Sequence, residues 1–176
     1  RKYEGYIVQR INLGECKIKN IKVALANVKL DIDRCCYGLP NNENAILNRK
    51  DFIDFLRISY EEKVHYLLLP EFYLPFEWIS DVLAFVRKSG ISVISGLQYA
   101  VSDGVAHNNV AVFPAIKSGE KKSYTNSCMF VREKNDYAPV EKEILALKGF
   151  KCLDQRTPYY QIFQQNGIKY GLFLCY

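Results

Sequence analysis

The first part of the chain alternates short apolar runs with longer stretches of helical periodicity. Apolar runs at 21–28, 65–69 and 90–96 are typical of strands, and the last of them lies between two glycines. Between these runs, residues 44–62 and 75–88 repeat apolar positions every three or four residues, which predicts two helices with an apolar face. This strand–helix order favours parallel pairing, with the helices packed on a face of the sheet.

The second part of the chain predicts mainly antiparallel strands. Residues 108–116 and a stretch within 122–132 are expected to form a hairpin, with "KSGE" as its turn. The region 133–158 resembles a loop, although "EKEILALKGF" has room for a turn or two of helix.

The last apolar segment, 159–175, predicts two strands joined at Asn166-Gly167, a dipeptide that favours a two-residue hairpin turn. Parallel units followed by hairpins indicate an α/β fold with a mixed sheet, formed by one domain over 1–176.

Composition and charge narrow the function classes. Apolar residues make up 49% of the chain, which excludes general disorder, and no apolar run approaches the roughly 20 residues of a membrane span. The net charge of +5 is carried by scattered basic residues, so we do not expect this domain to bind nucleic acid. Six cysteines without a C-x-x-C pair, and only two histidines, predict no metal site and no cofactor, but a cytoplasmic protein with free thiols.

Glu71 follows an apolar run and a proline in "HYLLLPEFYLP". We expect the strand at 65–69 to end at Pro70, which places Glu71 at the carboxyl edge of the sheet, where ligands of α/β folds bind. A carboxylate beside apolar and aromatic side chains can serve as a general base. On this stretch alone, a surface glutamate that caps the next helix is an equally good interpretation.

Cys175 ends the apolar run "GLFLCY", which is typical of a buried strand. Many free cysteines are simply buried, whereas a nucleophilic thiol needs a base or a cation nearby. His65 begins the Glu71 strand and therefore lies at its opposite end, and His107 is expected in a loop. A lysine is the better candidate to favour the thiolate and to bind an oxyanion.

Several lysines could favour the thiolate and bind the oxyanion. Lys142 lies in "YAPVEKEIL", but composition does not single it out from Lys121, Lys122 and Lys148.

These motifs together resemble the nitrilase, or carbon–nitrogen hydrolase, superfamily. The resemblance rests on "VALANVKLD", "LLLPEFYLP", "ISVISGLQY", "HNNVAVFP", "KEIL" and "YGLFLCY", in this order. In this sequence 71 residues separate Glu71 from Lys142, and 33 separate Lys142 from Cys175.

The resemblance implies a four-layer αββα sandwich and a Glu-Lys-Cys triad. Cys175 would be the nucleophile, Glu71 the general base and Lys142 the oxyanion donor, assisted by the backbone N–H of Tyr176. The family's second glutamate, about eight residues after the lysine, is replaced here by Phe150.

That replacement leaves Glu141 and Glu143 as candidates for the supporting carboxylate. The segment between "HNNVAVFP" and Lys142 is longer than is usual in the family, which keeps Lys121 and Lys122 as rivals of Lys142.

The family domain runs well beyond its cysteine, so we expect an incomplete sandwich that lacks its C-terminal side. The start on "RKYEGYIVQR", without methionine, favours a piece of a longer polypeptide. The expected function is hydrolysis of a small amide, with a small amide or nitrile as the bound molecule and no membrane. Homo-oligomers are common in the family, and further domains of the same polypeptide are expected partners.

The alternative is a regulatory or interaction domain of a larger protein, catalytically weak or inactive, for example fused to a bacterial reverse transcriptase. The resemblance alone suggests this fusion.

Overall fold

A computed structural model of the chain describes residues 2–3, 6–14, 18–28, 42–118, 124–153 and 159–174. The expected nucleophile Cys175, the neighbouring Tyr176, and the rival lysines Lys121 and Lys122 lie outside these ranges.

Five strands form the first sheet, in the order β11-β8-β5-β4-β3. They are β3 (Val23–Leu25), β4 (Tyr66–Leu74), β5 (Ser92–Leu97), β8 (Asn109–Phe113) and β11 (Phe130–Glu133). The first three are parallel, and β8 and β11 are added antiparallel. The mixed sheet predicted from the alternation of strands and helices is therefore confirmed.

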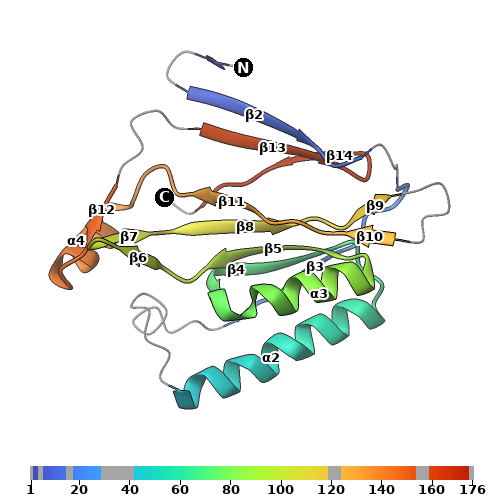
Figure 1. Cartoon of the computed structure of the whole chain (residues 1–176), viewed down its shortest axis with the longest axis horizontal. Coiled ribbons are helices and arrows are strands. Elements are labelled where there is room, and N and C mark those ends of the chain that lie inside the picture. Colours follow the sequence, from blue (N-terminus) through green and yellow to red (C-terminus); the bar gives the residue numbers. More distant parts are fainter. Residues whose placement is uncertain are drawn as a thin grey trace.

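Two helices, α2 (Asn42–Glu61) and α3 (Ile79–Ser89), cover one face of this sheet (Figure 1). The 3-10 turn η1 (Phe76–Trp78) leads into α3. Val82 and Val86 of α3 are fully buried, as predicted, and pack in one core cluster with Phe52 of α2 and strand residues. Burial of each such valine stabilises the fold by roughly 1.5–3 kcal/mol.

A second sheet lies on the other face of the first (Figure 1). Its order is β1-β2-β13-β14, with β1 (Lys2–Tyr3), β2 (Tyr6–Asn12), β13 (Tyr159–Gln165) and β14 (Ile168–Gly171). The hairpin at Asn166-Gly167 is confirmed, and both residues have the positive φ, 55° and 85°, that such a turn requires. The strand β2, parallel to β13, was not predicted from the sequence.

The two sheets are joined by apolar and polar contacts. The rings of Phe130 and Phe163 meet at 5.6 Å, and buried Gln165 donates from Nε2 to Ser92 Oγ at 3.1 Å and to the Ala115 carbonyl at 3.0 Å. The described residues thus form a helix layer and two sheet layers of the expected sandwich, incomplete as anticipated.

Two strand boundaries differ from the expectation. Strand β4 continues through Pro70 to Leu74, because a shift of register against β5 after Leu69 absorbs the residue that lacks an N–H. Strand β14 ends at Gly171 and does not run on to 175. Beyond this strand, the carbonyl of Leu172 accepts a hydrogen bond from Arg132 in the first sheet.

The remaining elements lie at the two ends of the first sheet. A small sheet has the order β12-β7-β6 and joins β6 (Ala100–Ser102), β7 (Val105–His107) and β12 (Lys151–Cys152). Strands β9 (Ile116–Ser118) and β10 (Tyr124–Asn126) extend the predicted hairpin, and α4 (Pro139–Leu147) lies in the region expected to be mostly loop. No helix within the described ranges has the length and apolarity needed to cross a bilayer.

Candidate active site

Glu71 lies in an irregular part of β4, where the register shift bends the strand. The next residue, Phe72, has a φ of 61°, a conformation that costs a bulky residue about 1–3 kcal/mol. Gly96 of β5 makes room for this backbone, since a Cβ there would lie 2.7 Å from Phe72 N and 2.9 Å from Glu71 C. The bulge therefore needs glycine on the neighbouring strand.

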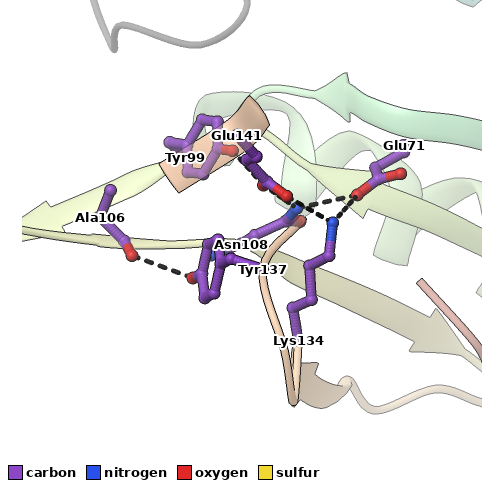
Figure 2. Close-up of polar contacts among 7 residues, drawn as sticks. All are labelled: Glu71, Tyr99, Ala106, Asn108, Lys134, Tyr137 and Glu141. Carbon is purple, nitrogen blue, oxygen red and sulfur yellow. Dashed lines mark hydrogen bonds and ion pairs between the residues drawn. The ribbon is translucent and has the colours of Figure 1, made fainter. Parts of the chain in front are cut away.

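Asn108, fully buried just before β8, bridges two carboxylates. Its Nδ2 donates to Glu71 Oε1 at 2.8 Å and to Glu141 Oε1 at 3.0 Å (Figure 2). Because ionised carboxylates only accept hydrogen bonds, this arrangement fixes the orientation of the side-chain amide.

Lys134 lies at ion-pair distance from Glu71. Its Nζ lies 2.6 Å from Glu141 Oε2 and 3.6 Å from Glu71 Oε1, and its side chain is only 5% exposed (Figure 2). The backbone places it there, since the N–H of Lys134 donates to the Asn108 carbonyl at 2.8 Å and so continues the pairing of β11 with β8. Glu141 reaches the same point from the first turn of α4.

Two tyrosines, Tyr99 and Tyr137, hydrogen-bond to members of this cluster. The hydroxyl of Tyr99 donates to Glu141 Oε1, and its ring stacks on Phe72 at 4.8 Å. Tyr137 donates to the Ala106 carbonyl at 2.9 Å and accepts from the Asn108 N–H at 2.8 Å (Figure 2). Burial raises the pKa of Tyr137 well above its usual range, so the hydroxyl can do both throughout the neutral range.

The cluster is thus a closed ring of Glu71, Asn108, Glu141 and Lys134, with two carboxylates and one ammonium. Oε1 of Glu71 is held by Asn108 and Lys134, whereas its Oε2 has no hydrogen-bond partner among the described residues. The ring therefore presents one carboxylate oxygen that can take a proton, beside an ammonium that can stabilise negative charge.

The structure brings together some of the residues named from the sequence. Glu71 and Glu141 are in the ring, whereas Lys134 and Asn108 were not considered. Lys142 follows Glu141 in α4, and because successive helical residues lie about 100° apart, it leaves the helix on a different side.

Of the other candidates, Lys148 is the residue directly after α4, and Glu143 is an exposed residue within that helix. Cys175, Tyr176, Lys121 and Lys122 are outside the described residues. A signal for Lys134 existed in the sequence, since it precedes Glu141 by seven residues, close to the lysine–glutamate separation that the resemblance implies.

Neither histidine belongs to the ring. His65 Nδ1 accepts from the Lys22 N–H at 2.9 Å. His107 lies in β7 rather than in the expected loop, 2.7 Å from Glu133 Oε1 and 3.1 Å from Ser102 Oγ. Within the part of the chain that is described, no three His, Cys, Asp or Glu side chains are arranged to hold a metal ion.

No family model matches the chain, and no curated protein matches it either. Several solved structures, however, are similar to it. An amidase from Nesterenkonia sp. superposes with a TM-score of 0.52 at 15% identity, over 88% of this chain and 55% of that one.

Two variants give similar values. A Nesterenkonia AN1 amidase from the nitrilase superfamily, with its cysteine replaced by serine, has a TM-score of 0.50 at 16% identity, over 87% of this chain and 55% of that one. A glutamate-to-glutamine variant, carrying the acetamide moiety of fluoroacetamide on its active-site cysteine, has the same score and identity, over 89% of this chain and 56% of that one.

The first sheet, the second sheet and the helix layer are therefore arranged as in known amidases, which confirms the resemblance at the level of the fold. The chain spans little more than half the length of these amidases, and its fold is similar to that of an amidase from the nitrilase superfamily.

Proposed function

We propose that this chain belongs to a carbon–nitrogen hydrolase that cleaves a small amide through a cysteine nucleophile. The observation that carries the proposal is the buried ring in which Glu71 and Lys134 meet, at the carboxyl end of the parallel strands of a nitrilase-type fold. A purely regulatory domain has no need to keep two carboxylates and an ammonium in so little solvent.

In this proposal Cys175 is the nucleophile and Glu71 the general base. The thiol proton passes to Glu71 as the sulfur attacks the amide carbon, and the C=O oxygen takes up the negative charge. Lys134, in place of Lys142, stabilises that oxyanion together with the backbone N–H of Tyr176. Loss of one such donor typically lowers the rate by about 10²–10³-fold.

The intermediate then collapses to a thioester, and Glu71 returns its proton to the departing nitrogen, which leaves as ammonia or an amine. Water, deprotonated by Glu71, attacks the thioester carbon, and the carboxylic acid and the free thiol are released. Glu141 holds Lys134 by the 2.6 Å ion pair, and Asn108 keeps both carboxylates in place. The acetamide adduct belongs to the similar amidase and supports a small amide as the first substrate class to test.

Matched lysine variants test the proposal. In a panel of short aliphatic amides, ammonia release should be abolished in Cys175→Ala, and iodoacetamide labelling of residue 175 should disappear. Lys134→Met should lower kcat/KM by at least about 100-fold, whereas Lys142→Met should stay within about threefold of the wild type.

Because removal of Lys134 leaves buried carboxylates without their cation, Lys134→Arg, which keeps the charge, is measured beside it with circular dichroism of every variant. Equal activity of wild type and Cys175→Ala would refute the proposal. Equal effects of the two lysine substitutions would remove Lys134 from it.

A further inference from the structure

Arg132 is a buried cation that lies outside the ring of Glu71, Asn108, Glu141 and Lys134. The residue is 4% exposed, and no carboxylate among the described residues lies within ion-pair distance of its guanidinium. Burial lowers its pKa, against a smaller opposing effect of Tyr160 and Tyr159. An unpaired buried charge lowers the stability of the fold, so the contacts of the guanidinium should explain why position 132 is an arginine.

The side-chain contacts of Arg132 are with Tyr160 of β13 and with the two residues that follow β14, Leu172 and Phe173. Nη1 donates to the carbonyl of Leu172, and the guanidinium lies over the rings of Tyr160 at 4.9 Å and Phe173 at 5.9 Å. The rings of Tyr160 and Phe173 are themselves 5.9 Å apart. Arg132 thus lies beside a pair of aromatic rings that contact each other, while its guanidinium donates to a backbone carbonyl.

The segment held in this way lies beyond the last strand pairing that the structure describes. Pairing of β14 with β13 ends at Gly171, and Phe173 is 81% exposed. Leu172 and Phe173 come directly before Leu174 and the candidate nucleophile Cys175 in the sequence.

Lys134, the lysine of the ring, is the residue directly after the strand β11 that contains Arg132. Side chains alternate along a strand, so Arg132 and Lys134 lie on one face of β11 and its extension, roughly 7 Å apart. That face is turned to the second sheet, as the contact of Phe130 with Phe163 shows. The proposed oxyanion donor Lys134 and the residue that contacts the segment before Cys175 are therefore only two positions apart, at the end of β11.

We propose that Arg132 is a positioning residue, which ties the Leu172–Phe173 backbone to β11 and thereby sets Cys175 against Glu71 and Lys134. This inference rests on the proposed function, because it assumes that Cys175 is the nucleophile. The ligand of Arg132 is the chain itself, so substitution should lower kcat more than it raises KM.

Three variants and a control test this role. Arg132→Met removes the charge at similar length, and Arg132→Lys keeps the charge but lacks the planar fork that stacks on rings. Phe173→Ala removes a largely exposed ring, so it should leave the fold intact. Arg10→Met, at an exposed position of β2, controls for the loss of a guanidinium.

The readouts are amide turnover, the rate of iodoacetamide labelling at Cys175, and hydrogen exchange in a peptide that covers 171–176. We expect kcat to fall by about 100-fold in Arg132→Met and about 10-fold in Phe173→Ala, with KM changed less than threefold. Exchange in the terminal peptide should become faster in both, Arg132→Lys should be intermediate, and Arg10→Met should match the wild type.

Unchanged kcat and unchanged exchange in folded Arg132→Met and Phe173→Ala would overturn the inference. If the wild type shows no reaction that depends on Cys175, the proposed function fails on its own, and the inference about catalysis fails with it. In that case, hydrogen exchange in the 171–176 peptide still tests whether Arg132 holds the Leu172–Phe173 segment. If Arg132→Met does not fold, Phe173→Ala and Arg132→Lys give the decision.

Discussion

Replacement of Gly96 by alanine tests how the neighbouring strand positions Glu71. The new Cβ would lie 2.7 Å from Phe72 N and 2.9 Å from Glu71 C, and it would also meet Glu71 Cα. Ordinary contact begins near 3.4 Å, so the backbone of the bulge has to retreat by on the order of 1 Å. Backbone atoms cannot rotate out of the way, and the carboxylate of Glu71 moves with them.

Overpacking of this kind costs roughly 2 kcal/mol of unfolding free energy, which lowers Tm by about 4–8 °C in a chain of this size. A displacement of about 1 Å in a group that must receive a proton lowers kcat/KM by about 100-fold. Thermal unfolding followed by circular dichroism gives the first quantity, and ammonia release from an amide gives the second.

Gly171→Ala is the matched control, because among the described residues its Cβ would meet Gln161 O and the Phe173 ring, both at an ordinary 3.7 Å. This control should keep the Tm and the turnover of the wild type. The reasoning about Gly96 would be refuted if Gly96→Ala behaved as this control does in both assays.

Three further predictions concern the surroundings of the site. Asn108→Asp sets a third carboxyl group against Glu71 and Glu141 and removes two hydrogen bonds to charged groups. The free energy of unfolding, measured with urea at pH 7, should fall by about 3–6 kcal/mol, and a fall of less than about 1 kcal/mol would contradict the ring. Burial raises the pKa of Tyr137 above its unfolded value of 10.0, so its contribution is complete below that pH and is lost as the pH rises through the folded pKa; urea unfolding between pH 9 and 11 should show a shallower decline in Tyr137→Phe than in the wild type. Partial desolvation raises the pKa of the Cys128 thiol although the residue as a whole is exposed, so iodoacetamide should alkylate it somewhat more slowly in the folded chain at about pH 8 than in urea, and equal rates would contradict the raised pKa.

The parts of the fold that repeat at short range could be predicted from the sequence. Helix α3 was anticipated with its inner face, since Val82 and Val86 lie four residues apart on it, and the Asn166-Gly167 turn was anticipated from its dipeptide. Strand β2 was missed because its mixed sequence YIVQRIN shows little alternation and is stabilised by pairing with β13, far along the chain. Pairing between distant segments leaves only a weak local signal.

The site divides in the same way. Glu71 could be found because it follows a conspicuous apolar run within β4. The ring around it was missed, because Lys134 stands in a short polar connection whose place is fixed by a backbone hydrogen bond to Asn108, and its separation of seven residues from Glu141 is only a weak signal. The K-x-x-L pattern favours Lys142, which lies on α4. Glu141 was among the candidates, and only the start of α4 shows which way it points.

The left-handed backbone conformation of Phe72 implies a trade-off between thermal stability and activity at this site. Glycine at position 72 would relieve a strain of about 1–3 kcal/mol, so selection for heat resistance alone should favour it. Such a change would also remove the ring that stacks on Tyr99, the residue whose hydroxyl holds Glu141. Laboratory evolution toward higher Tm should therefore reach glycine at 72 only in lineages in which hydrolysis is not selected.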